Sequence, residues 1–276
     1  MKQPRIGVAH LTALELAPAA LIMQSARAGF NSVGIRTNPV APGMPCYPLK
    51  AGTDEHRELV RLLDDNGMTV QEVEFISIVP ELDVQSYATM FEAAAGLGAQ
   101  AVTVSGDDDD FSRLVDSLGR LCDLAAGFDL RIDLEPMRWR HVGNIGAARR
   151  VLDAAARSNG AILVDALHLA RSGSTPAELR EFPASRLRAV QICDAPAVAP
   201  IGDDATIREA REGRLPPGQG ALPLVDLLCS LPDDIAISAE MPFKTLPVLE
   251  RLTLAFNASN DLIQRARKER TGTRCN

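Results

Sequence analysis

Short runs of apolar residues recur along the chain, and each run is too short for a helix of ordinary length. Most of them are rich in valine and isoleucine, and they lack the strict alternation of apolar and polar positions that a half-exposed antiparallel sheet requires. This pattern predicts parallel strands that are covered on both faces, at residues 6–11, 33–36, 70–77, 101–105, 131–135, 161–165, 189–193 and 235–240.

The segments between these runs follow a helical period instead. Leu114, Leu118 and Leu121 fall on one stripe after Asp110, which we expect to cap that helix, and Thr53 is expected to cap another. Further amphipathic segments predict helices over 14–28, 83–96, 144–158 and 246–268.

The alternation of strands and helices predicts one α/β fold. Eight strand–helix units in a chain of this length are typical of a single (β/α)₈ TIM barrel, which we place at residues 1–265. A doubly wound open sheet is the alternative, but it usually has fewer strands and a glycine-rich phosphate-binding turn, and no such turn is found. We expect long loops at 173–176, 196–204 and 214–220, and a flexible C-terminal tail over 266–276.

Composition narrows the class of function. The 276 residues carry a net charge of −7, which argues against a basic surface for nucleic acid or for an acidic membrane. The five cysteines are far apart and form no CxxC pair, so we expect a reducing, cytoplasmic setting without disulfides. No apolar stretch has the length of a signal peptide or a membrane span. These features favour a protein that acts on small molecules.

Oxygen-bearing side chains stand at the ends of four consecutive predicted strands. They are Glu135, Asp165, Gln191 and Glu240. In a barrel of this kind the strand ends meet at one mouth, where three clustered carboxylates call for compensation. This donor set suits Mn²⁺ or Mg²⁺ and admits Co²⁺, whereas Zn²⁺ more often has histidine or cysteine ligands. The alternative is that each residue is satisfied singly, by an arginine or by capping the next helix.

Further polar residues are candidates for contacting a substrate. His168 and His141 follow two of these strands, and Arg214 lies in a loop of prolines and glycines, where a guanidinium can hold a carboxylate or a phosphate. Glu74 is a weaker candidate for lining the mouth, together with Arg36 and Trp139. The acidic run Asp107–Asp110 looks metal-binding, but we interpret it mainly as a loop that ends in a helix cap.

The motifs at the strand ends resemble those of the sugar phosphate isomerase/epimerase family of xylose isomerase-like TIM barrels. They are Leu-Glu-Pro at 134–136, Val-Asp-Ala-Leu-His at 164–168, Val-Gln-Ile-Cys-Asp-Ala at 190–195, Arg-Leu-Pro-Pro-Gly-Gln-Gly at 214–220 and Ala-Glu at 239–240. The resemblance implies that Glu135, Asp165, Gln191 and Glu240 are metal ligands, and that His168 and Arg214 contact the substrate.

Two positions depart from the common pattern of that family. Many members carry histidine where Gln191 stands, and many carry an acid at the end of the second strand, where this chain has Gly34-Ile35-Arg36. Gln191, the stretch Arg140-His141-Val142 and the Pro-Gly-Gln-Gly loop are instead similar to the bacterial 3-dehydroshikimate dehydratases of the same superfamily. The zinc nuclease branch needs more histidine ligands than the four histidines of this chain supply.

The resemblance leads to three hypotheses about function. The first is an isomerase or epimerase of a sugar, sugar phosphate or keto acid, which moves a proton next to a carbonyl through a metal-stabilised enediolate with Glu135 and Glu240 as base and acid. The second is a dehydratase, with His168 or Glu135 as base and His141 as the acid that helps to expel hydroxide. The third is a barrel that binds a small molecule without catalysis. Barrels of this kind commonly pair, so a homodimer is allowed.

Overall fold

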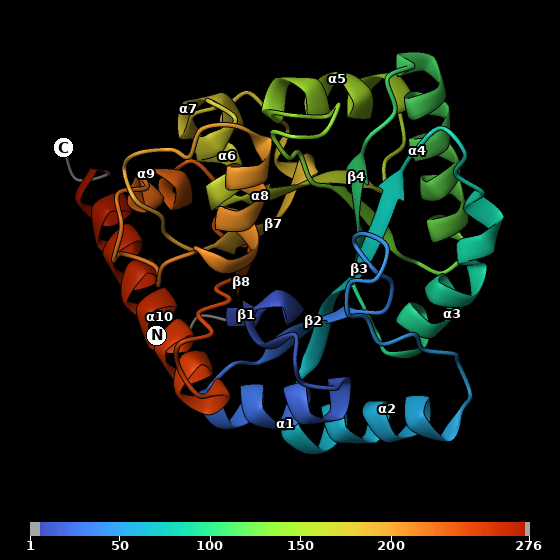
Figure 1. Ribbon diagram of the computed structural model, residues 1–276, viewed down its shortest axis with the longest axis horizontal. Coiled ribbons are helices and arrows are strands. Elements are labelled where there is room, and N and C mark those ends of the chain that lie inside the picture. The colour runs from blue at the N-terminus through green and yellow to red at the C-terminus, as the bar shows by residue number, and fades with distance from the viewer. Residues whose placement is uncertain (1–5, 274–276) are drawn as a thin grey trace.

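The computed structural model describes residues 6–273, and in it eight parallel strands close into a barrel in chain order, β1 to β8 (Figure 1). The strands are β1 (Ile6–Val8), β2 (Ser32–Arg36), β3 (Thr69–Ile78), β4 (Ala101–Gly106), β5 (Arg131–Leu134), β6 (Gly160–Asp165), β7 (Leu187–Ile192) and β8 (Ala236–Ala239). All eight predicted strands are present, and pairing of β1 with β8 closes the sheet. The predicted (β/α)₈ barrel is confirmed, and the open sheet is excluded.

Helices surround the barrel, as Figure 1 shows. The main ones are α1 (Pro18–Ala28), α2 (Asp54–Asn66), α3 (Ala88–Gly96), α4 (Phe111–Ala126), α5 (Ile145–Ala155) and α10 (Val248–Thr273). Both predicted caps are confirmed, because Thr53 accepts a hydrogen bond from the His56 amide and Asp110 accepts one from the Arg113 amide. The apolar stripe of α4 is buried against the barrel.

Helix α10 reaches further than the sequence analysis predicts. It continues from Val248 to Thr273, so that residues 266–273 are helical where a tail was expected. Ala266 is buried, and Arg270 anchors the last turns through Asp233 and the backbone carbonyl of Leu231. Residues 274–276 lie outside the described part of the chain.

The second half of the chain contains short elements that the sequence analysis did not predict. They are α6 (Ala166–Arg171), α7 (Pro176–Leu179), α8 (Asp203–Glu212) and α9 (Leu224–Cys229), and three 3₁₀ turns, η1 (His10–Ala13), η2 (Val84–Tyr87) and η3 (Ala184–Arg186), complete the fold. Helix α8 occupies part of the expected loop at 196–204, and it brings Ala210 and Arg211 to the mouth of the barrel.

The interior of the barrel contains buried polar side chains, among them Glu72, Thr103 and Asp133. Gly34 of β2 makes room for part of this layer, because a Cβ atom there would lie 3.1 Å from Glu72 Oε1 and 3.3 Å from Glu74 Oε1. A residue without a side chain at this position therefore lets two carboxylates from β3 point into the barrel.

The described cysteines form no disulfides, and the described helices are not of the membrane-spanning kind. Cys46, Cys122, Cys193 and Cys229 are free thiols, and Cys275 lies outside the described residues. Burial raises the pKa of Cys122 to about 12, as expected of a structural thiol. Within residues 6–273, no helix combines the length and the apolar character that a membrane crossing would need.

Candidate functional site

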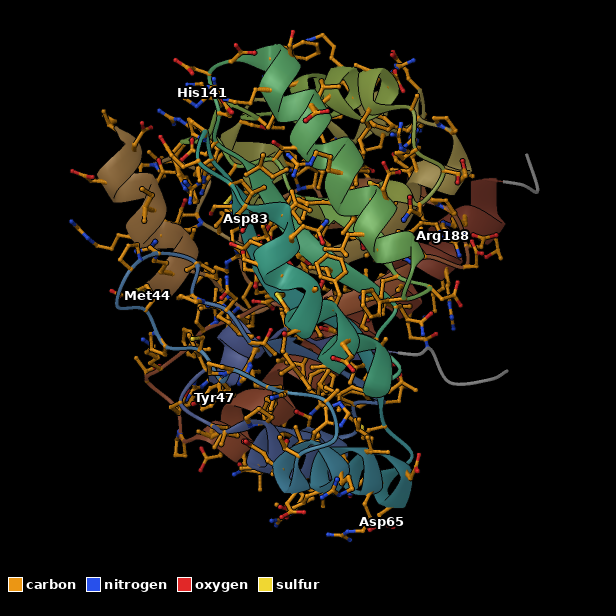
Figure 2. All side chains as sticks on the ribbon, turned by 90° about the vertical axis from the view of Figure 1, so that its right-hand side faces the viewer. Met44, Tyr47, Asp65, Asp83, His141 and Arg188 are labelled. Atoms are coloured by element: carbon orange, nitrogen blue, oxygen red, sulfur yellow. The ribbon has the colours of Figure 1, made fainter. Side chains whose placement is uncertain are left out.

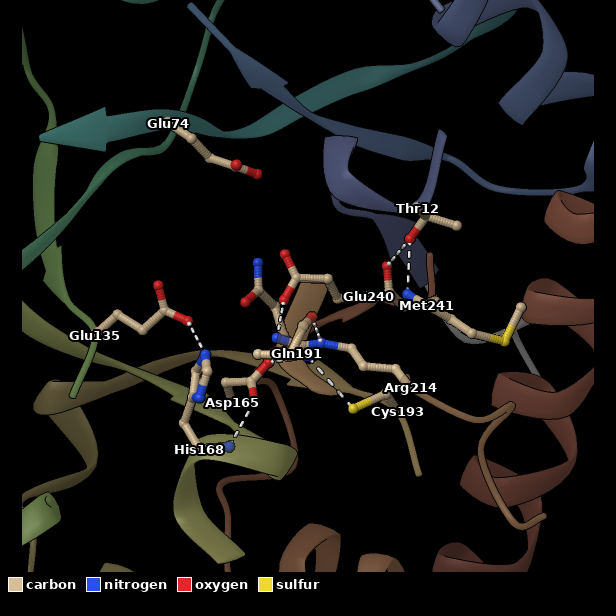
Figure 3. Close-up of polar contacts among 12 residues, drawn as sticks. Thr12, Glu74, Glu135, Asp165, His168, Gln191, Cys193, Arg214, Glu240 and Met241 are labelled. Atoms are coloured by element: carbon tan, nitrogen blue, oxygen red, sulfur yellow. Dashed lines mark hydrogen bonds and ion pairs between the residues drawn. The ribbon is translucent and has the colours of Figure 1, made fainter. Parts of the chain in front are cut away.

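The four side chains that the sequence analysis places at the strand ends lie together inside the mouth of the barrel (Figure 3). Glu135 follows β5, Asp165 ends β6, Gln191 lies in β7 and Glu240 follows β8, and all four are at least 95% buried. Strand pairing aligns these residues along the barrel axis. Asp165 is paired with Gln191 on the neighbouring strand, and the Glu240 amide donates to the Ile192 carbonyl. The closed barrel thus brings together residues that are far apart in sequence.

The tightest group combines two of these carboxylates with a histidine. One ligand atom each from Glu135, Asp165 and His168 lies within 4.8 Å of the other two. The His168 amide donates to Asp165 Oδ1 over 2.8 Å, so Asp165 caps α6 and fixes the histidine beside itself. His168 Nε2 lies 3.6 Å from Glu135 Oε1, and Trp139 packs edge-on against the imidazole.

The imidazole of His168 is in its neutral form near pH 7. Burial lowers its pKa to about 4, and the charge of Asp165 offsets only part of that effect. Its Nδ1 has no hydrogen-bond partner within residues 6–273. A neutral imidazole with a free nitrogen can accept a proton or bind a metal ion.

Arg214 lies between two of the expected metal ligands. Its Nη1 is 2.5 Å from Asp165 Oδ2, its Nη2 is 2.8 Å from Glu240 Oε2, and its side chain is 2% exposed. The guanidinium also donates to the Ala210 carbonyl and to the Cys193 thiol. Arg214 therefore lies deeper in the site than a residue that only holds the outer end of a substrate.

Asp194, which follows β7, fixes the loop that carries Arg214. Asp194 accepts hydrogen bonds from the amides of Gly218 and Leu222, each over 2.9 Å. Gly220 passes so close that a Cβ atom would lie 2.4 Å from Asp194 Oδ1. The Pro-Gly-Gln-Gly sequence is thus a tight turn around Asp194, and this turn sets the entry of Arg214 into the barrel.

Arg214 alone cannot balance all the carboxylates of the site in their ionised forms, and their pKa values reflect this. Burial raises the pKa of Glu135 well above its ordinary range, and the charges of Glu240 and Asp165 raise it further. Burial raises the pKa of Glu240 to about 8, although Arg214 opposes this rise. Asp165 is buried too, but Arg214 and His168 hold its pKa at about 2.

The donor atoms of this site fit a divalent cation. Gln191 Oε1 is buried and has no hydrogen-bond partner among the described residues, while Gln191 Nε2 donates to Glu72 Oε1 over 3.0 Å. An unpartnered carbonyl oxygen beside three carboxylates supplies hard oxygen ligands. Of the four expected ligands, Glu135 and Asp165 belong to the compact donor group, in which His168 adds a nitrogen that Zn²⁺ also accepts. Gln191 and Glu240 lie at the same mouth of the barrel and could complete the set.

A cavity of about 270 Å³ opens above these residues. Glu135, His168, Gln191 and Glu240 line its floor, and its walls include Trp139, Met137 and Phe75. Its lining also contains the cationic side chains of Arg36, Arg140, Arg211, Arg214 and Lys244. Arg36 and Arg214 are buried and paired with acids of the site, so Arg140, Arg211 and Lys244 are the cations of the outer wall, where Glu212 also lies.

Glu74 and Arg36 lie in the cavity lining, as the sequence analysis expects, and they contact each other. Arg36 donates two hydrogen bonds to Glu74 Oε2, at 2.8 and 2.5 Å, and both side chains are buried. The Arg36 amide donates to His10 Nδ1, and His10 stacks on Tyr47. Glu74 Oε1 is buried and has no hydrogen-bond partner within the described chain.

His141 and the acidic run lie outside the cavity lining. The side chain of His141 is 54% exposed and faces Asp107, while its neighbour Arg140 lines the cavity and pairs with the same carboxylate. In Figure 2, His141 lies on the same side of the molecule as Met44, which lines the cavity, and opposite Arg188 at the start of β7. The other acids of the run are engaged too, since Asp108 holds Arg113 through two hydrogen bonds and Asp110 caps α4.

Glu72 is a polar residue of the site region that the sequence analysis missed. It is 1% exposed, and it reaches Gln191 from the opposite wall of the barrel. Its position in an apolar strand, where the side chains at 71, 72 and 74 are all polar, is the only sequence signal that distinguishes it.

The sequence matches one known protein family. The model of the family described as xylose isomerase-like TIM barrel matches residues 22–253. No curated protein matches the sequence.

Solved structures share the fold at low sequence identity. A xylose isomerase-like TIM barrel/4-hydroxyphenylpyruvate dioxygenase fusion protein has a TM-score of 0.80 at 21% identity, covering 98% of this chain and 45% of its own, so this chain spans less than half of that protein. An IolI protein with a bound zinc atom has a TM-score of 0.77 at 18% identity, covering 95% and 99%. The probable 3-DHS dehydratase AsbF of Bacillus anthracis, involved in petrobactin synthesis, has a TM-score of 0.72 at 11% identity, covering 92% and 98%.

Proposed function

The chain belongs to the xylose isomerase-like TIM barrel family, and from this premise we propose that it is a divalent-metal-dependent enzyme that removes a proton next to the carbonyl of a small polar substrate. The observation that carries this proposal is that Glu135, Glu240 and the unpartnered oxygen of Gln191 meet at one cavity, with Asp165 buried beside them. The zinc atom of the IolI structure supports a divalent metal in this fold.

A cation held by Glu135, Asp165, Gln191 and Glu240 would polarise the carbonyl and stabilise the negative charge that develops on its oxygen. His168 lines the cavity beside Glu135, and this pair is in position to take the proton from carbon. Arg214 holds Asp165 and Glu240 in place. Trp139 orients the imidazole of His168 from the side.

Within this class we propose a lyase of the 3-dehydroshikimate dehydratase type. The two sides of the site differ, because Glu135 is paired with the base His168, whereas Glu240 is paired with Arg214. Proton removal on one side fits dehydration: the base takes a proton from the carbon next to the carbonyl, a carbon–carbon double bond forms, and the hydroxyl on the next carbon leaves as water with the proton that the base gives back. His141, expected as the acid, lies outside the cavity lining and has no part in this step. The cationic side chains of Arg140, Arg211 and Lys244 in the cavity wall support a substrate that carries a carboxylate.

An isomerase or epimerase is the second candidate. Such an enzyme needs a proton-transfer group on each side of the substrate. Glu135 and Glu240 come from strands β5 and β8, which are not neighbours in the barrel, and both line the cavity. A sugar, sugar phosphate or keto acid would then lie between them.

The test is a panel of ketoses, keto acids and 3-dehydroshikimate, assayed with EDTA-treated protein before and after addition of Mn²⁺, Mg²⁺ or Zn²⁺. Rising ultraviolet absorbance from 3-dehydroshikimate supports the dehydratase, and proton exchange into deuterated solvent with a ketose supports the isomerase. We expect Glu135→Gln to abolish turnover, while Glu58→Gln on the exposed face of α2 leaves it unchanged.

Three outcomes would contradict the proposal in different ways. Turnover that survives complete removal of metal would refute the metal dependence. Metal uptake without turnover of any compound in the panel would favour a barrel that only binds its ligand. Isomerisation of a ketose without dehydration of 3-dehydroshikimate would replace the first candidate by the second.

A further inference from the structure

The side chain of Gln191 has two ends of similar size, and only one of them can bind a cation. Its carbonyl oxygen Oε1 has lone pairs to offer, whereas its amide nitrogen Nε2 carries two hydrogens. A histidine at a metal site does not have this ambiguity of oxygen against nitrogen. A glutamine ligand therefore needs a neighbour that selects which end faces the metal.

Glu72 supplies that selection in this structure. Glu72 Oε1 accepts a hydrogen bond of 3.0 Å from Gln191 Nε2. Burial, with the charge of Glu74, raises the pKa of Glu72, but an oxygen that bears no proton accepts this hydrogen bond in the ionised and in the protonated carboxyl alike. The contact binds the nitrogen end to the barrel wall and leaves Gln191 Oε1 buried in the cavity floor without a partner among the described residues. Both side chains are nearly inaccessible to solvent, at 1% for Glu72 and 2% for Gln191.

Two further features hold Glu72 in place. Thr103 of β4 donates from its hydroxyl to Glu72 Oε2 over 3.3 Å, so both carboxylate oxygens accept a hydrogen bond. Gly34 leaves the space into which Glu72 Oε1 extends, since a Cβ atom there would lie 3.1 Å from that oxygen. Thr103 of β4, Glu72 of β3 and Gln191 of β7 are thus joined by hydrogen bonds, and Gly34 of β2 leaves room for them.

We propose that Glu72 is a positioning residue of the metal centre, which fixes the amide of Gln191 so that Oε1 faces the cation. The role rests on the proposed metal dependence. Glu72 itself lies outside the cavity lining and is not assigned as a ligand.

The experiment measures Mn²⁺ binding to EDTA-treated protein by calorimetric titration, for wild type, Glu72→Gln, Glu72→Met, Gln191→Ala and the double variant E72M/Q191A. Glutamine at position 72 can turn its amide nitrogen to Thr103 Oγ1, which accepts as well as donates, and so keep its oxygen toward Gln191 Nε2. We therefore expect Mn²⁺ affinity within about threefold of wild type. Methionine removes the acceptor at similar volume, and we expect roughly tenfold weaker binding, in the range seen when partners of metal ligands are replaced. In the Gln191→Ala background the same Glu72→Met change is expected to alter affinity less than about twofold.

The double variant separates positioning from general damage to the barrel. Three results would each overturn the role of Glu72. They are wild-type Mn²⁺ affinity in E72M, an equal loss of Mn²⁺ affinity in E72Q, and a loss in E72M that is just as large in the Gln191→Ala background. Should E72M fail to fold, Thr103→Val removes the second hydrogen bond to Glu72, and wild-type Mn²⁺ affinity in that variant would overturn the role as well. Wild-type protein that takes up no Mn²⁺ would overturn the metal centre itself, and with it this inference.

Discussion

Replacing Arg214 by methionine removes a guanidinium that pairs with two carboxylates of the site. The side chain is 2% exposed, and it lies 2.5 Å from Asp165 Oδ2 and 2.8 Å from Glu240 Oε2. Methionine has a similar length and no charge, so the change leaves both carboxylates buried without their partner. The metal-free protein is therefore expected to lose much of its stability.

The size of the loss follows from the burial. Breaking a buried ion pair by removing one partner costs about 3–5 kcal/mol. For a domain of this size, each kcal/mol lost from the free energy of unfolding lowers the midpoint temperature by about 2–4 °C. The midpoint of thermal unfolding should therefore fall by roughly 6–20 °C. The charge of a divalent cation can replace that of Arg214, and a ligand at a hundred times its Kd adds about 2.7 kcal/mol to the stability of the folded state. Mn²⁺ should therefore restore a large part of the loss.

The assay is thermal unfolding of EDTA-treated wild type and Arg214→Met, each with and without Mn²⁺. The matched control is Arg61→Met, because Arg61 pairs with Asp65 on the exposed surface of α2, where loss of an ion pair costs at most about 1 kcal/mol. Metal-free Arg214→Met that unfolds at the wild-type temperature would refute the reasoning. So would Mn²⁺ that stabilises wild type more than the variant, because Arg214 and the cation compensate the same carboxylates.

Three further predictions address other parts of the site. Glu240→Gln should weaken Mn²⁺ binding at least tenfold in a calorimetric titration, because it removes a charged ligand; unchanged affinity would exclude Glu240 from the ligand set. Gly34→Ala should destabilise the fold by about 1–3 kcal/mol in urea unfolding, since its Cβ would press on Glu72 and Glu74, and a wild-type urea midpoint would show that these side chains move without cost. His10 is buried, and burial lowers its pKa below 6.5. The unfolded chain therefore binds a proton at this residue more readily than the folded protein does. The stability that neutral His10 contributes is complete above pH 6.5 and is lost as the pH falls toward the pKa of the folded state. His10→Gln should thus lose less stability than wild type between pH 7.5 and 5.5, and equal losses would contradict this.

The barrel could be predicted from local patterns because each strand and most helices are encoded by their own residues. The apolar runs give the eight strands, and capping residues such as Thr53 and Asp110 mark where helices begin. The short helices α6 to α9 could not be predicted, since segments of four to ten residues are stabilised mainly by packing against the barrel. The length of α10 was underestimated for a related reason, because Arg270 is anchored by residues about forty positions earlier in the chain.

The sequence by itself determined that four oxygen-bearing side chains stand at strand ends, because a side chain at the end of a parallel barrel strand must reach the mouth. Only the tertiary structure decided how these groups are compensated and oriented. Arg214 is 49 residues from Asp165, and Gln191 is 119 residues from Glu72, and no local pattern encodes such pairs. The closed barrel creates them, because it excludes water from its interior and brings buried polar groups from distant segments within hydrogen-bond distance of one another.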